Sequence, residues 1–315
     1  EILRCLVGSE MCIRDRLVNM LYNIVDRIYI GHIPGDGDLA LTGVGVCLPL
    51  ILIVSAFAAL VASGGAPRAS IYMGKQDHDT AEKILGGCFA LQLAVSALLT
   101  AVLLLWSRDL LLAFGASENT IGYAASYMQI YAVGTVFVQL TLGLNAFITA
   151  QGFAKIGMRT VLIGAVANIV LDPIFIYGLH MGVRGAALST ALGQIITIAI
   201  YLPGFFGQKH TLRFALPCGR WLVPALSALK AGMATSVQYL YQMIFFLVCN
   251  NLLIRLGGET AVAVFDVIQN TSYLILYLFE GTGRAMQPIL STYQGEHNRQ
   301  GMRNTVRLGF TAGLT

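Results

Sequence analysis

Long apolar stretches, separated by short polar segments, run along almost the whole chain. Residues 39–67 and 84–107 are two of them, and neither contains Asp, Glu, Lys or Arg. About 20 apolar residues in an α-helix cross the hydrocarbon core of a bilayer, whereas a barrel strand needs only about 10 residues of alternating polarity. The pattern therefore predicts an all-α polytopic membrane protein.

These stretches predict eight membrane spans and the beginning of a ninth. Four of them have more than 30 residues, which is longer than a bilayer requires, so we expect them to tilt, kink or project from the hydrocarbon. The predicted spans are residues 17–34, 39–73, 84–106, 120–152, 160–179, 182–206, 225–256 and 260–294, and the ninth begins near residue 303.

Basic residues are distributed unequally between the two alternate sets of loops. One set carries ten of them and the other only three. Because cytoplasmic loops are enriched in Lys and Arg, we expect the first set, and with it the N-terminus, to be cytoplasmic. The ten are Lys75, Lys83, Lys155, Arg159, Lys209, Arg213, Arg220, Arg299, Arg303 and Arg307, and the three are Arg108, Arg184 and Arg255.

The chain contains an internal repeat. Three residues recur after a shift of 221 positions, at the cytoplasmic end of a long span in each case, as the pairs Pro67/Pro288, Tyr72/Tyr293 and Gly74/Gly295. We interpret this as two copies of a unit of six helices and about 220 residues. Because a unit of six helices begins and ends on the same side of the membrane, the two copies have the same orientation and form a parallel repeat. A complete protein would then have roughly 440 residues.

The repeat predicts how the chain is divided. Residues 17–206 would form an N-lobe of six helices, 207–224 a cytoplasmic connection, and 225–315 part of a C-lobe. Residues 1–16 carry several charges directly before an apolar stretch. We expect them to be a non-native segment that takes no part in the fold.

Composition narrows the function. Only 11% of the residues are charged, against about 25% in soluble domains. A net charge of +4 is too modest to indicate nucleic-acid binding. The six cysteines form no CxxC pair and have no neighbouring histidines, so they predict neither a metal site nor a cofactor. Since no nucleophile–base pair or phosphate loop is present, we do not expect an enzyme.

Four acidic residues lie within the predicted spans: Asp26, Asp172, Asp266 and Glu280. An ionised Asp at the centre of a membrane helix costs roughly 2.5–3.5 kcal/mol, so such residues are generally functional. Asp266 is near the outer end of its span, and we expect it at the interface. Glu280 lies deep, where it either faces a cavity or pairs with Arg284 one turn later.

Polar residues from three spans are predicted at one depth in the outer half of the membrane. Measured from the outer ends of their spans, Asp26 lies about 7–12 Å deep, Asp172 about 9–14 Å and Thr190 about 12 Å. Asn168 precedes Asp172 by one turn and Gln194 follows Thr190 by one turn, on the same helix faces.

Carboxylates, an amide and a hydroxyl at one level are hard oxygen donors that suit a small cation. We therefore predict a Na⁺ or proton site at Asp26, Asn168, Asp172 and Thr190. Pro173 removes a backbone donor and can kink the helix next to this site. Two alternatives are open: Arg27 or His32 could neutralise Asp26, and Thr190 could bond to its own helix.

Other polar residues give weaker signals. Gln139 and Asn145 on the fourth predicted span, together with Gln194 and Glu280, are candidates for lining a cavity. Hydrogen bonding within the helix bundle explains Gln139 and Asn145 equally well. The small residues at 182–193 predict close helix packing.

Four segments carry a resemblance to a known family: LYNIVDRIYIGHI at 21–33, NIVLDPIFIYG at 168–178, GVRGAALSTALGQ at 182–194 and AMQPILSTYQGE at 285–296. They resemble the multidrug and toxic compound extrusion (MATE) transporters, nearest to the prokaryotic DinF-like branch. The similarity extends over residues 17–315, and the Asn-x-x-x-Asp-Pro element that begins at Asn168 is its most specific part.

The resemblance implies twelve helices in two lobes around a central cavity, in the cell membrane of a prokaryote. It implies alternating-access export of amphipathic, often cationic compounds in exchange for H⁺ or Na⁺, with the cation site at Asp26, Asn168, Asp172 and Thr190. The expected partners are the small-molecule substrate and the bilayer, with no nucleic acid and no cofactor besides the coupling ion, and the protein is expected to be a monomer. Export of a lipid-linked saccharide or polysaccharide is the alternative, although intramembrane Lys and Arg are sparse.

Overall fold

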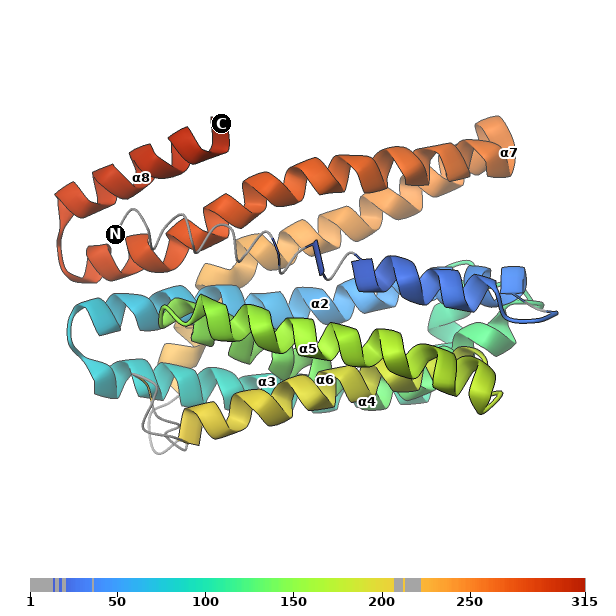
Figure 1. Ribbon diagram of the computed structural model, residues 1–315, viewed down its shortest axis with the longest axis horizontal. Helices are drawn as coiled ribbons and strands as arrows, with labels where there is room; N and C mark the ends of the chain where they lie inside the picture. Colours follow the sequence, from blue (N-terminus) through green and yellow to red (C-terminus); the bar gives the residue numbers. More distant parts are fainter. Residues whose placement is uncertain are drawn as a thin grey trace.

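The computed structural model describes residues 14, 17–18, 21–35, 37–206, 212 and 222–314. Within this part of the chain the secondary structure is helical and contains no strand. The helices run roughly along one long axis (Figure 1). Six of the described helices are long and apolar enough to cross a membrane. The prediction of an all-α polytopic membrane protein is therefore confirmed.

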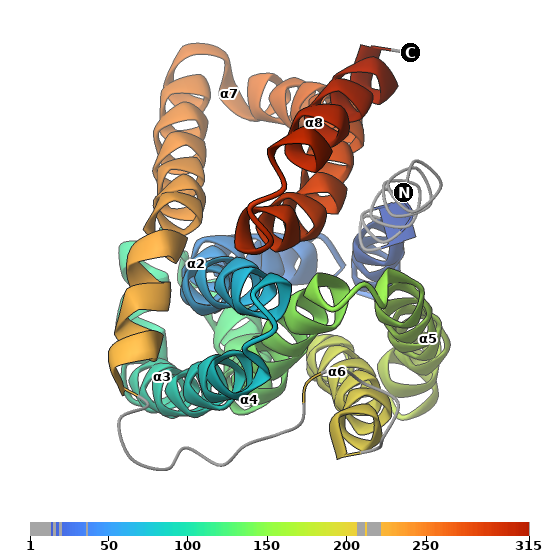
Figure 2. The same cartoon turned by 90° about the vertical axis from the view of Figure 1, so that its left-hand side faces the viewer.

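The helices follow one another with short connections. A first helix is described over residues 21–31. The others are α2 (Gly37–Gly74), α3 (His78–Ala113), α4 (Ile121–Ala150), α5 (Ala154–Pro173), the π-helical turn η1 (Ile174–Gly178), α6 (Val183–Phe206), α7 (Leu222–Gly295) and α8 (Arg299–Leu314). Viewed end-on, α2 to α6 and the first helix gather into one bundle, and α7 and α8 lie along one side of it (Figure 2).

Helix α7 is a hairpin of two antiparallel arms, although helical backbone continues through the reversal. The rings of Phe246 and Phe265 have centroids 6.5 Å apart, whereas 19 residues of straight helix would separate them by about 28 Å. Figure 1 shows the ribbon turning back at the end that carries the α7 label. The two arms correspond to the predicted spans 225–256 and 260–294.

The turns after α2 and α7 confirm the internal repeat. Asp77 N donates to Tyr72 O over 2.9 Å, and Asn298 N donates to Tyr293 O over 3.0 Å. Both bonds thus join residues that correspond under the shift of 221 positions. A residue with positive φ precedes each polar residue, Gln76 at 64° and His297 at 56°.

The polar residues of these two turns also cap the following helix in the same way. Asp77 Oδ1 accepts a hydrogen bond from Thr80 N at 3.0 Å, and Asn298 Oδ1 accepts one from Gly301 N at 2.9 Å. A side-chain acceptor at this position satisfies one of the free N–H groups at a helix start. Two stretches with little sequence identity therefore fold into one local structure.

The two copies touch at the ends of α2 and α7, which the sequence predicts to be cytoplasmic. A Cβ added to Gly74 would lie 3.2 Å from the Cα of Gly295, and one added to Gly295 would lie 3.1 Å from the Cα of Gly74. Each glycine also packs against the backbone of the other copy, at Thr292 and Ile71 respectively. The contact is close to self-complementary, and glycine allows the backbones to approach this closely.

Some predictions fall on residues outside the described part of the chain. They include residues 1–13 of the predicted non-native segment and most of the predicted connection at 207–224. The side chains of Arg255 and Asp266 also lie outside it. The interfacial placement of Asp266 and the domain boundaries stay predictions.

Candidate cation site

The backbones of helices α5 and α6 are in direct contact, because a glycine of each helix faces a glycine of the other. A Cβ on Gly164 would lie 3.1 Å from Gly193 O, and a Cβ on Gly193 would lie 3.0 Å from Gly164 O and 3.5 Å from the Cβ of Asn168. Near the start of α6, Gly185 packs in the same way on the backbone of Phe175. This confirms the predicted close packing at 182–193 and brings the polar face of α5 against α6.

The end of α5 changes from α to π geometry directly after Pro173. Proline has no N–H to continue the α-helical bonding, and the next turn closes with Leu179 N donating to Ile174 O over 2.9 Å. Within this turn Tyr177 Oη donates to Tyr29 O at 2.7 Å, and the two rings meet edge to face. The π turn, a feature common at functional sites, thus ties α5 to the first helix.

A hydrogen-bonded cluster forms where α5 meets α6. Asp172 and Ser189 have no exposed surface, and Ser189 Oγ donates to Asp172 Oδ1. Asn168 Nδ2 donates to Thr190 Oγ1 at 3.3 Å and lies 3.5 Å from Ser189 Oγ. The structure therefore brings three of the four predicted residues together, and it adds Ser189.

Asp26 on the first helix is the fourth predicted residue. It is buried, and its charge interacts with those of Asp172 and Arg27. The phenol of Tyr127, which is only 4% exposed, is also within electrostatic range of Asp26. Within the described part of the chain no ion pair joins Asp26 to Arg27 or His32, both of which are exposed. Neutralisation of Asp26 by Arg27 or His32 therefore stays an alternative that no direct ion pair supports in the described residues.

Three oxygen atoms of this site are buried and have no hydrogen-bond partner among the described residues. They are Asp26 Oδ1, Asn168 Oδ1 and Asp172 Oδ2. Leaving a buried polar atom unpaired costs about 1–3 kcal/mol, and native proteins contain few such atoms. Two carboxylates and an amide oxygen are the donors that a hard cation or a proton takes, so these residues fit the predicted coupling ion.

The candidates on α4 and α6 lie elsewhere in the bundle. Gln139 is fully buried, and its Nε2 donates to Val54 O on α2 at 2.9 Å. Asn145 is half-buried against Gly157 of α5, and its Oδ1 has no described partner. Gln194 is half-buried on α6. Gln139 thus forms a hydrogen bond within the helix bundle, which was the other explanation of this residue. That Gln139, Asn145 and Gln194 line a cavity stays a prediction.

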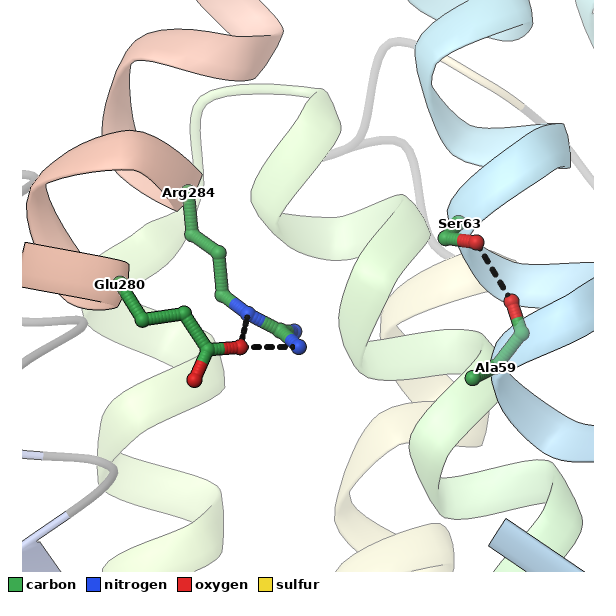
Figure 3. Close-up of polar contacts among 4 residues, drawn as sticks. All are labelled: Ala59, Ser63, Glu280 and Arg284. Atoms are coloured by element: carbon green, nitrogen blue, oxygen red, sulfur yellow. Dashed lines mark hydrogen bonds and ion pairs between the residues drawn. The ribbon is translucent and has the colours of Figure 1, made fainter. Parts of the chain in front are cut away.

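Glu280 forms an ion pair within α7. Arg284 Nε and Nη2 each lie 2.8 Å from Glu280 Oε1, and the two side chains are partly exposed. Figure 3 shows both nitrogens directed at the same carboxylate oxygen. The residues that correspond in the first copy are the uncharged Ala59 and Ser63, where Ser63 Oγ donates to Ala59 O at 2.7 Å. The predicted pairing with Arg284 is therefore the arrangement present.

A recess of about 510 Å³ lies between α3, α4 and α6 and is separate from the cation site. It is lined almost entirely by apolar side chains such as Leu104, Phe137 and Leu192. None of the predicted site residues borders it. An apolar recess between membrane helices suits hydrocarbon, so it adds no candidate to the polar site.

Sequence reasoning missed Ser189 as a member of the site. The predicted depth points to Thr190, and Ser189 lies within one residue of that predicted depth. The small residues Ala186, Ser189 and Gly193 follow one another at helical spacing and form the face of α6 that packs on α5. Ser189 carries the only hydroxyl among these three residues. A hydroxyl on the face that packs against α5 would lie near Asn168 or Asp172, and this was the signal in the sequence that could have identified Ser189.

Comparisons with known proteins agree with this architecture. The sequence model of the MatE family matches residues 12–174 and 234–315. The multidrug export protein MepA of Staphylococcus haemolyticus is 26% identical over 93% of this chain and 64% of its own length. MepA of Staphylococcus aureus strain MRSA252 is 22% identical over 92% of this chain and again 64% of its own length. The chain thus spans 64% of the length of these curated relatives.

Solved structures match along nearly the whole chain. A MATE structure in a straight conformation superposes with a TM-score of 0.88 at 25% identity, covering 98% of this chain and 69% of its own. An outward-facing multidrug resistance MATE transporter gives 0.87 at 26% identity, with 98% and 68% coverage. A transporter of the MOP superfamily from Pyrococcus furiosus gives 0.87 at 25% identity, also with 98% and 68% coverage.

Proposed function

The chain belongs to the MatE family, and we propose that its protein exports amphipathic, often cationic small molecules in exchange for H⁺ or Na⁺. The names of the curated relatives, multidrug export proteins, support this substrate class. The unequal distribution of Lys and Arg supports a cytoplasmic N-terminus in the cell membrane of a prokaryote. The protein would work as a monomer, without a cofactor.

The observation that carries the proposal is a set of three buried oxygens, on Asp26, Asn168 and Asp172, that have no hydrogen-bond partner in the part of the chain that the structure describes. Two carboxylates that share a buried site repel each other, and each is poorly solvated. A proton or Na⁺ at this site would reduce the repulsion between the two carboxylates and compensate for their poor solvation. Asp26 and Asp172 would supply the charge, Asn168 a neutral oxygen, and Thr190 would hold the Asn168 amide by its hydrogen bond.

Exchange requires that the cation and the substrate favour different conformations. A ligand shifts a conformational equilibrium only by its difference in affinity between the two states. Asp26 lies on the first helix, whereas Asn168 and Asp172 lie on α5. A cation shared between them would draw the two helices together, and its release would let them separate. The π turn after Pro173 would be the place where α5 adjusts.

The proposal is tested with the full-length protein in liposomes that hold a fluorescent cationic dye. A pH gradient and a Na⁺ gradient are imposed separately, with the electrical potential clamped to zero. We expect one of the two gradients to drive dye transport uphill and its dissipation to stop transport. Uphill transport that depends on neither gradient, or no dye transport under either, would reject the proposal.

A further inference from the structure

Within the described part of the chain, the hydroxyl of Ser189 is a polar group outside the proposed site that touches two of its residues. It donates to Asp172 Oδ1, and Asn168 Nδ2 lies 3.5 Å away. Its other contact is Ala186 O on its own helix, at 2.9 Å. A single hydroxyl proton serves two acceptors, and a bond to a carboxylate is stronger than one to a neutral carbonyl. The bond to Asp172 is therefore the favoured one.

This contact decides which oxygens stay unpaired. Ser189 provides the only hydrogen bond to Asp172 within the described part of the chain, and that bond holds Oδ1 while Oδ2 stays without a partner. On Asn168 the amide nitrogen faces the α6 hydroxyls, so the amide oxygen is the atom left over. Ser189 thus fixes the Asp172 carboxylate and, together with Thr190, the Asn168 amide, and the remaining oxygen of each group has no partner among the described residues.

The position of Ser189 is itself rigid. The side chain is fully buried on the face of α6 that packs against α5 at glycine contacts. A group held this way cannot follow a carboxylate that moves, so it constrains the carboxylate instead. Partners in the outer shell of an ion site orient its ligands, and their loss typically costs about 10- to 100-fold in affinity.

We propose that Ser189 is a positioning residue of the cation site, orienting the Asp172 carboxylate and the Asn168 amide so that one oxygen of each is available to the coupling ion. The inference rests on the proposed function, because it assigns Ser189 a part in that same site. Ser189 itself does not have to touch the ion. Its removal should weaken ion binding without removing either charge.

The test measures dye export by the full-length protein as a function of the driving cation. Ser189→Ala should raise the KM for that cation by about 10-fold or more while the maximal rate stays within about twofold. Ser189→Cys, which keeps a similar shape but has a weaker donor, should fall between Ser and Ala. The matched control is Ser96→Ala, because Ser96 is equally buried but bonds only to Leu93 O on its own helix.

The outcomes separate the inference from the proposed function. An unchanged KM in Ser189→Ala, or a lower maximal rate with unchanged KM, overturns the positioning role, provided that Asp172→Asn abolishes coupling. If Ser189→Ala fails to fold, the Cys variant decides: its KM must rise relative to wild type. Coupled transport that survives in Asp172→Asn would instead reject the proposed site and the inference with it.

Discussion

Two carboxylates that the sequence predicts within membrane spans, Asp172 on α5 and Glu280 on α7, have opposite surroundings. Glu280 meets a guanidinium one turn along its own helix, and both side chains keep some exposed surface. Asp172 is fully buried, accepts one hydroxyl bond and leaves its other oxygen without a partner among the described residues. A second carboxylate, on Asp26, lies within electrostatic range of it.

The difference separates an acid that is already neutralised from one that has no counter-charge in the described part of the chain. A pair at i and i+4 forms within any regular helix, so Glu280 has its counter-charge without help from the rest of the fold. A proton or a small cation that enters the site would neutralise Asp172. This is why we assign the coupling role to Asp172 and not to Glu280.

Neutralising the two carboxylates separately should give the largest contrast. Asp172→Asn removes the charge that the cation would bind, and we expect dye transport to lose its dependence on the cation gradient. Coupling free energies of about 1–3 kcal/mol correspond to roughly 5- to 150-fold effects, so the loss should be of that size. The measurement is gradient-driven export by each variant, normalised to protein in the membrane.

Glu280→Gln is the matched control in the same assay, because it also neutralises an intramembrane carboxylate. We expect its transport to respond to the cation gradient as in the wild type. If both substitutions abolish the gradient dependence equally, the contrast between the two sites is wrong.

The Asp172 site should also depend on the close approach of α5 and α6. Gly193→Leu would force side-chain atoms against Gly164 O and the Asn168 side chain, and overpacking of this kind costs about 1–3 kcal/mol. We expect a lower thermal midpoint in detergent and a raised KM for the cation. Gly45→Leu serves as the control, since a Cβ at Gly45 would meet no atom within 4 Å. Equal midpoints for the two variants would contradict the expectation.

The Glu280–Arg284 pair should contribute little to stability. Its side chains are 30% and 45% exposed, and partly exposed ion pairs contribute at most about 1 kcal/mol. Glu280→Gln should therefore lower the free energy of unfolding by no more than about that amount, as measured by unfolding in mixed micelles. A larger loss would indicate that the pair has a further role in packing the two copies together.

The smallest effect concerns the two equivalent turns. Hydrogen bonds from Thr80 hold the pKa of Asp77 below its usual range. The helix cap that the ionised Asp77 side chain provides is therefore intact above the pKa of Asp in the unfolded chain, about 3.9, and is lost as the pH falls through the lower pKa of the folded protein. Asn298, the corresponding cap, does not titrate. Hydrogen exchange of the Thr80 amide should therefore accelerate on acidification relative to that of Gly301. Equal acceleration at both amides would contradict this.

The candidate site could be predicted from sequence only in part. Hydrophobic run lengths and the rise per residue placed Asp26, Asp172 and Thr190 at one depth, and helical spacing placed Asn168 beside Asp172. Depth alone does not say which way a side chain points. Ser189 was missed for this reason, and Gln139, which bonds to α2, could not be distinguished from a cavity residue.

The sequence by itself determined the helical membrane architecture and the repeat, because each follows from local pattern and fixed helix geometry. The tertiary structure decided which polar groups are paired. Whether Asp172 meets Ser189 depends on how closely α5 and α6 pack and how they are rotated. Those are properties of the glycine contacts between the two helices, and no single stretch of the chain encodes them.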